Sequence, residues 1–154
     1  MTPEARLAQL GIKLAPPGKP GGIYKPAVVA SGLIFVSGHG PVREDGTMVT
    51  GRVGEELNLE QARQAARLVG IAILGTLRAQ LGSLDRVRCL VKTLGMVNAV
   101  PGYTQQPQVI NGYSELMVEI FGPDLGVGAR SAVGMGSLPG NIPVEIECIF
   151  EVTV

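Results

Sequence analysis

The segment Val144 to Val152, VEIECIFEV, sets the strongest constraint on how this chain folds. Side chains alternate between the two faces of a β-strand, so this segment has two unlike faces. One face is wholly apolar, and the other carries Glu145, Glu147, Ile149 and Glu151. The pattern predicts a half-buried strand in a sheet with one covered face. It leaves open whether the three carboxylates meet water or line a site.

The clearest helix signal runs from Leu59 to Leu81. Its apolar residues fall at spacings of three and four, which places them on one stripe of a helix: Leu59, Ala62, Ala66, Val69, Ile73 and Leu77. Asn58 and Gln61 have the spacing of a capping box, and Gly82 is a typical helix stop. We therefore predict one long amphipathic helix over residues 59–81.

The other elements are predicted from local signals, and we treat residues 1–154 as one domain with an N-terminal helix and loop extension at 1–20. Ser31-Gly32 between two apolar runs predicts a hairpin. The remaining predicted elements are a short helix from Thr2 to Leu10, a strand at 86–97, a helix at 109–121 and a strand at 129–138. This order predicts an α+β fold with one mixed sheet and two helices packed on one face.

Two helices of this length leave the other sheet face uncovered. In the strand after residue 128, we expect Ala129, Val133 and Met135 to pack beneath the helices. We expect Arg130 to point to the uncovered face together with Glu145. The strand at 86–97 is expected to place Val87, Cys89, Val91 and Thr93 on one side, with Leu90, Leu94 and Met96 on the outer side. A face of this composition is best hidden against further copies of the chain.

Composition excludes several classes of function. Thirteen basic and thirteen acidic residues give zero net charge, and no basic run is present, which argues against nucleic acid or an anionic membrane as a partner. No apolar run reaches about 18 residues and no signal peptide is visible, so we expect a cytoplasmic protein. With one His and two Cys, we expect no metal site, and we read Cys89 and Cys148 as small buried hydrophobes.

Three segments in order resemble the YjgF/Rid family, named for reactive-intermediate deaminases and also called the L-PSP endoribonuclease family. The first is Tyr24 with the hairpin that ends in FVSGHGPV. The second is GSLDRVRCLVKTLGMV, and the third is GARSAVGMGSLPGNIPVEIECIF. Together with the order of elements, the resemblance covers about residues 20 to 153.

The resemblance implies a chorismate-mutase-like fold and a homotrimer whose sheets face inward as a barrel. The ligand clefts would lie between subunits, and the last two strands need not be sheet neighbours. Similar family members hydrolyse enamine and imine products of amino-acid dehydratases, such as 2-aminoacrylate, to 2-oxo acids and ammonia. The resemblance implies no cofactor and a small carboxylate as substrate.

The resemblance also assigns site residues. Arg130 matches the arginine that grips the substrate carboxylate, and Glu145 matches the glutamate that orients the attacking water. The other four matches are Tyr24 at the cleft, Ser37 and Gly38 in the segment whose backbone lines it, and the cleft asparagine Asn111.

The chain departs from the archetypal deaminases at several positions. Ala132 stands where they often carry Cys, Lys25 follows the tyrosine in place of serine, and His39 replaces a glutamine. We expect a loop role for His39. The segment 98–108 and the N-terminal helix are longer, as in a longer subgroup of the family.

Two other functions remain open from the sequence. One is a trimer that binds or senses a small carboxylate without turnover. The other is the endoribonuclease or translation-inhibitor activity attached to the family name, for which the neutral charge and the few aromatic residues offer little support.

Overall fold

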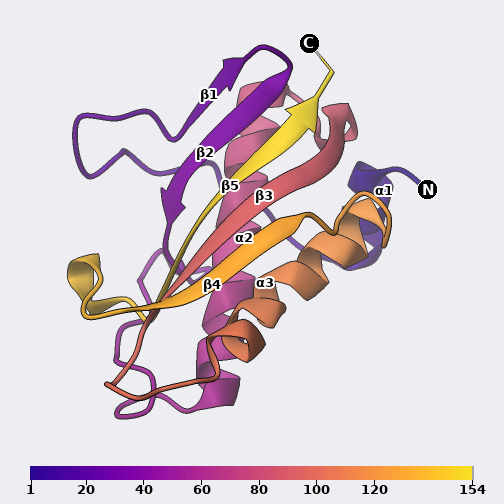
Figure 1. The fold of residues 1–154 in the computed structure, drawn as a ribbon. Helices are drawn as coiled ribbons and strands as arrows, with labels where there is room; N and C mark the ends of the chain where they lie inside the picture. Colours follow the sequence, from indigo (N-terminus) through magenta and orange to yellow (C-terminus); the bar gives the residue numbers. More distant parts are fainter. Residues whose placement is uncertain (154) are drawn as a thin grey trace.

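The computed structural model describes residues 1–153. Five strands form one mixed sheet in the order β1-β2-β5-β3-β4, and the helices lie on one side of it (Figure 1). The helices are α1 Pro3–Gln9, α2 Leu59–Leu81 and α3 Gln106–Phe121. The strands are β1 Ala27–Ala30, β2 Leu33–His39, β3 Val87–Asn98, β4 Ala129–Met135 and β5 Val144–Val152. Single 3₁₀ turns occupy η1 Leu84–Arg86 and η2 Pro139–Asn141. The predicted α+β fold, with one mixed sheet and two long helices on one face, is confirmed.

The long helix α2 has the predicted bounds and the predicted caps. The Asn58 side chain accepts from the Gln61 N–H at 2.9 Å, and the Gln61 side chain accepts from the Asn58 N–H at 2.9 Å. Gly82 ends the helix at φ 83°, a conformation that glycine adopts without steric cost. Helix α3 begins at Gln106, earlier than predicted, because Pro107 fits the first turn of a helix.

Strand β5 lies in the middle of the sheet, antiparallel to both β2 and β3. Its apolar side chains are buried beneath α2 and α3, with Val144, Ile146 and Phe150 fully enclosed. The hairpin between β1 and β2 turns at Ser31 and Gly32, which both have positive φ. Strand β4 pairs in parallel with β3 through the crossover of α3, so the last two strands are not neighbours, an arrangement that the family resemblance allowed.

The predicted side-chain alternation of β3 is wrong at three positions. Val87 and Thr93 face the helices as expected, but Leu90 is also buried, while Cys89 is half-buried and Val91 is exposed. The cause is two register shifts against β5, one after Val87 and one after Leu90. Each bulge adds a residue and reverses the alternation. Of the two cysteines, only Cys148 is the buried hydrophobe that the sequence predicted, and burial raises the pKa of its thiol to about 12.

The predicted orientation of β4 is also wrong. Arg130 pairs with Thr93 and Ala132 with Gly95, and both partners are buried on the face that the helices cover. Val133 instead pairs with Met96 on the helix-free face and is 38% exposed. The alternation within a strand does not fix which face is covered, because that depends on the register with the neighbouring strand. Arg130 therefore lies on the helix-covered side, opposite to Glu145.

Helices α2 and α3 approach closely at Gly112. A Cβ atom at this position would lie 2.0 Å from the backbone oxygen of Arg63, so only glycine fits. Beside this contact, Arg63 pairs with Glu115, and Arg67 pairs with Glu119 at 2.7 Å. Gly112 therefore sets the spacing of the two helices, and it does so next to Asn111.

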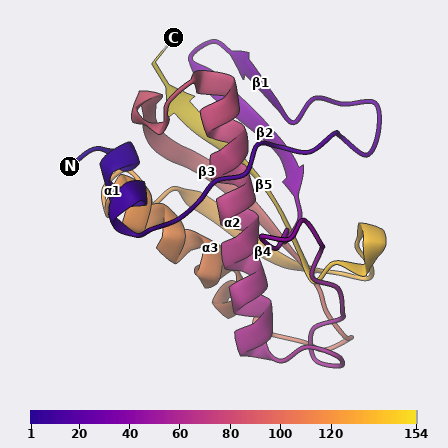
Figure 2. The ribbon, with the colours of Figure 1, turned by 180° about the vertical axis from the view of Figure 1, so that it is seen from behind.

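The N-terminal segment crosses the outer side of α2, away from the sheet (Figure 2). Helix α1 is capped by Thr2, and Glu4 pairs with Arg78 of α2 at 2.6 Å. Further along, a Cβ atom at Gly75 would lie 2.5 Å from the backbone oxygen of Ala15. The segment is therefore held against α2 at two points.

Candidate functional site

Arg130 is held on the edge strand β4 by side chains and backbone of α3. One guanidinium nitrogen donates to Asn111 Oδ1 at 2.8 Å and to Ser114 Oγ at 3.1 Å. The other nitrogen lies 3.4 Å from the Pro107 carbonyl oxygen. We call these four residues the arginine cluster. It brings together two predicted site residues, Arg130 and Asn111.

The charge of the arginine cluster is uncompensated. All three partners of Arg130 are neutral oxygen acceptors, and within residues 1–153 no carboxylate forms an ion pair with it. Burial lowers the pKa of Arg130, yet a guanidinium stays charged in proteins. A fixed guanidinium with no carboxylate partner is suited to bind the carboxylate of a ligand.

A separate cavity of about 530 Å³ brings together the other four predicted site residues: Tyr24, Ser37, Gly38 and Glu145. The Tyr24 hydroxyl accepts from the Gly21 N–H at 3.3 Å, and Ser37 Oγ donates to the Lys25 carbonyl at 2.6 Å. The first bond lies within the loop before β1, and the second fixes that loop against the end of β2. We call this cavity the glutamate cavity.

Gly38 makes room for the carboxylate of Glu145. A Cβ atom at Gly38 would lie 2.9 Å from both the carboxyl carbon and Oε2 of Glu145. The register of β2 shifts between Val36 and His39, so Gly38 lies within a bulge. The bulge therefore presents bare backbone to the carboxylate, and any larger side chain would displace it.

The carboxyl group of Glu145 holds its proton more readily than an exposed glutamate does. Burial raises its pKa, and the neighbouring charge of Glu147 raises it further. Glu147 lies two residues along β5 on the same face and also lines the glutamate cavity. A carboxyl group in this state is suited to donate a proton as well as to orient water.

The two groups of predicted residues do not meet within one protomer. Glu145 lies on the helix-free face and pairs with Met96, which in turn pairs with Val133 of β4. Arg130 lies three residues before Val133 and on the opposite face. Ser114 was not predicted at all, and Glu147 was predicted only as one of three carboxylates on a strand face, without a role in the site. Ser114 follows Asn111 by three residues, a helical spacing that puts both on one side of α3 and was available as a signal.

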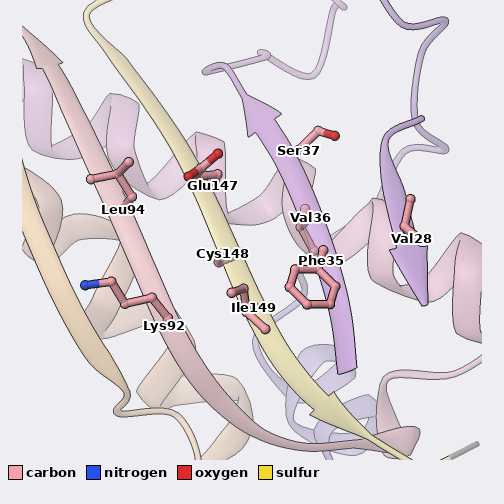
Figure 3. Close-up of a pocket in the computed structure, with 9 residues that line it drawn as sticks. All are labelled: Val28, Phe35, Val36, Ser37, Lys92, Leu94, Glu147, Cys148 and Ile149. Carbon is pink, nitrogen blue, oxygen red and sulfur yellow. The ribbon is translucent and has the colours of Figure 1, made fainter. Parts of the chain in front are cut away.

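The helix-free face of the sheet is apolar and hollowed at its centre. Figure 3 shows Phe35, Leu94 and Ile149 beside Lys92 and Glu147, which line a cavity of about 380 Å³. Lys92 Nζ donates to Ser131 Oγ at 3.1 Å. Phe35 is 43% exposed and Val28 48% exposed. Several large apolar side chains on one exposed face are typical of a surface that binds another protein.

His39 does not lie in a loop as predicted. It ends β2, and its ring points to the helix-covered side, where Nε2 lies 2.7 Å from Thr76 Oγ1 of α2. Across residues 1–153, no group of three or more His, Cys, Asp or Glu side chains is placed to hold a metal ion. The same residues contain no helix both long and apolar enough to span a bilayer.

Comparison with known proteins identifies relatives over nearly the whole chain. Protein TCP17 of Trypanosoma cruzi is 37% identical over 147 residues, which cover 96% of this chain and 92% of that protein. Atu1372 from Agrobacterium tumefaciens, whose crystal structure is known, is 38% identical in sequence to this chain. The match covers 99% of this chain and 93% of that chain, and the two structures superpose with a TM-score of 0.88. A Shewanella oneidensis structure described as a "putative endoribonuclease" shares the fold, with 24% identity, coverage of 99% and 100%, and a TM-score of 0.93.

A match to a protein-family model assigns the chain to a family. The model described as "YjgF/chorismate mutase-like, putative endoribonuclease" matches residues 4–148, which include both the arginine cluster and the glutamate cavity. The family resemblance and the chorismate-mutase-like fold that the sequence suggested are thereby confirmed. The chain belongs to the YjgF/chorismate mutase-like family.

Proposed function

We propose that this chain forms a homotrimer that hydrolyses small enamine and imine carboxylates of the 2-aminoacrylate type to 2-oxo acids and ammonia. The observation that carries the proposal is the division of the site into two halves. The arginine cluster supplies a carboxylate-binding guanidinium, and the glutamate cavity supplies a carboxyl group with a raised pKa. Each half lacks what the other has, so a complete site needs two protomers.

In the proposed reaction, Arg130 binds the carboxylate of the enamine. The protonated carboxyl group of Glu145 donates its proton to the methylene carbon of the enamine, which gives an iminium. Water held by Glu145 adds to the imine carbon and passes a proton to the nitrogen. The C–N bond then breaks with its electron pair going to nitrogen, the hydroxyl proton passes to the carboxylate of Glu145, and ammonia leaves as the C=O bond forms. No oxidant or cofactor enters this balance, and positioning of water supplies much of the rate enhancement.

Trimer formation is supported by the apolar helix-free face. We expect Phe35→Glu to dissociate the trimer, because a charge placed in a buried apolar contact costs several kcal/mol. Light scattering after size-exclusion chromatography measures the mass, and Ala79→Glu, on the exposed side of α2, is the control. Hydrolase activity should fall with the trimer, since each cleft needs two protomers. A wild-type protein that elutes as a monomer would contradict the proposal.

The pH dependence of the reaction tests the role of Glu145. If its protonated form acts, kcat/KM falls as pH rises through its raised pKa. Glu147→Gln removes the neighbouring charge, lowers the pKa of Glu145 and shifts this fall to lower pH. Glu151→Gln, further along β5, should leave the profile in place. A profile unchanged by Glu147→Gln would exclude Glu145 as the titrating group.

The decisive assay adds the protein to 2-aminoacrylate generated in situ from serine by a dehydratase, and follows pyruvate release. Acceleration over the uncatalysed rate supports the proposal. Saturable 2-oxo acid binding without acceleration would favour a carboxylate-binding trimer. RNA cleavage that survives stringent purification and disappears in Arg130→Gln would favour the activity in the name of the Shewanella relative.

A further inference from the structure

A cavity of about 290 Å³ lies on the other side of β2 from the proposed cleft. Residues 11–17 of the N-terminal segment and the outer side of α2 enclose it, where that segment crosses the helix (Figure 2). It shares no lining residue with the glutamate cavity or with the cavity at the centre of the helix-free face. Its volume is near the lower end of the range for small-molecule sites. We call it the α2 pocket.

The floor of the α2 pocket is a second apolar stripe of α2. Leu68, Ile71 and Ala72 line it and are half-buried, and Gly75 continues the stripe at helical spacing. The close approach of Ala15 at Gly75 anchors the N-terminal segment at the edge of the pocket, beside the lining residues Ala72 and Thr76. The segment thus covers one end of the stripe tightly and leaves room above Ala72.

The inner wall of the α2 pocket is polar but neutral. His39 Nδ1 lies 2.6 Å from the Ser37 carbonyl oxygen, which can only accept, so Nδ1 carries the hydrogen. Nε2 then accepts from the Thr76 hydroxyl at 2.7 Å. Burial lowers the pKa of His39, which favours this neutral form. The His39–Thr76 pair is therefore satisfied and forms a rigid wall.

The mouth of the α2 pocket is more basic than acidic. Lys13 lines it, is exposed and forms no ion pair within residues 1–153. Arg43 also lines it, although its guanidinium donates to Thr47 Oγ1 and to the Met48 carbonyl. Glu44 is the only acidic residue in the lining. An apolar floor with a basic mouth fits an apolar anion.

We propose that the α2 pocket binds a small monocarboxylate with a branched aliphatic or aromatic body. The hydrocarbon would lie over Ile71 and Ala72, and the carboxylate would face the ammonium of Lys13. The proposal is independent of the proposed hydrolase, because the α2 pocket contains none of the residues that would act on the substrate.

The test uses 4-methylpentanoate as the probe, followed by heteronuclear NMR titration. It is made in the Arg130→Gln background, so that the arginine cluster cannot take up the carboxylate. We expect saturable binding with a Kd on the order of 1 mM and shifts at Ile71, Ala72 and Thr76. The neutral 4-methylpentanamide should bind about two- to fivefold more weakly, and Lys13→Gln should abolish this difference.

A pair of substitutions on α2, one inside the α2 pocket and one outside it, tests where the probe binds. Ala72→Phe should weaken binding of the probe at least about tenfold, because the ring occupies its space. Ala79→Phe, an exposed position on the same helix outside the lining, should not change it. If Ala72→Phe does not fold, Ala72→Leu fills less of the same space. Unchanged binding in a folded filled variant, or no saturable binding up to 10 times the expected Kd, about 10 mM, would overturn the proposal.

Discussion

Arg130→Gln is expected to lower kcat/KM for 2-aminoacrylate hydrolysis about 100-fold. Removing the cationic partner of a desolvated carboxylate typically costs about 2–5 kcal/mol, because the remaining charge is left unpaired. Most of the loss should appear as a raised KM, since the carboxylate is bound both before and during the reaction. The measurement is steady-state kinetics on the dehydratase-coupled substrate, with thermal unfolding to confirm the fold.

Two further variants make this result specific. Arg67→Gln breaks the exposed pair with Glu119 and should change kcat/KM by less than about twofold. Arg130→Lys keeps the charge but cannot hold Asn111 and the substrate carboxylate together, so we expect only partial recovery. Full activity in Arg130→Gln would show that the arginine cluster does not bind the substrate.

Gly112→Ala is expected to lower the free energy of unfolding by about 3 kcal/mol. The added methyl group would lie 2.0 Å from the Arg63 backbone oxygen, so α2 and α3 must move apart. Overpacking typically costs about 1–3 kcal/mol and occasionally more, and a backbone oxygen cannot rotate away. We therefore expect a cost of about 4 kcal/mol here, which the gain of about 1 kcal/mol from replacing glycine by alanine in a helix offsets only in part. Chemical denaturation at several protein concentrations measures the change.

The matched control is Gly70→Ala on the facing helix. Its Cβ atom would lie 2.8 Å from a terminal methyl of Leu116 and 3.3 Å from the Tyr113 ring, and side-chain atoms shift more readily than the backbone oxygen that Gly112→Ala would meet. We therefore expect Gly70→Ala to lower the free energy of unfolding by at least about 2 kcal/mol less than Gly112→Ala does. Equal stability of the two variants would contradict this prediction. It would mean that α2 and α3 can move apart at Gly112 at little cost in free energy.

Local signals predicted most elements of the fold. The capping box at Asn58, the Ser31-Gly32 turn and the stripe along α2 act through neighbours in the sequence, and all three appear as expected. The faces of β3 and β4 were not predictable in this way. They depend on two bulges against β5 and on the register of Arg130 with Thr93, both of which involve residues far apart in the chain.

In the candidate site, too, the residue types were predictable from the sequence, but their arrangement in space was not. The residue types matched from the family resemblance do gather in space, but in two places rather than one. The sequence put Arg130 and Glu145 on one face, whereas their strands present them to opposite faces. The bulge that presents Gly38 to Glu145 also turns His39 toward Thr76, so one extra residue in β2 contributes to two cavities.

The central position of β5 affects how the chain folds during its synthesis. No strand before residue 144 can replace it, because β2 and β3 are joined only through β5. During synthesis, the hairpin, both long helices and β4 therefore emerge before their sheet can close. Until residues 144–152 are available, β2 and β3 expose open edges, and such edges promote aggregation. We expect nascent chains of this protein to depend on chaperones until the last strand inserts.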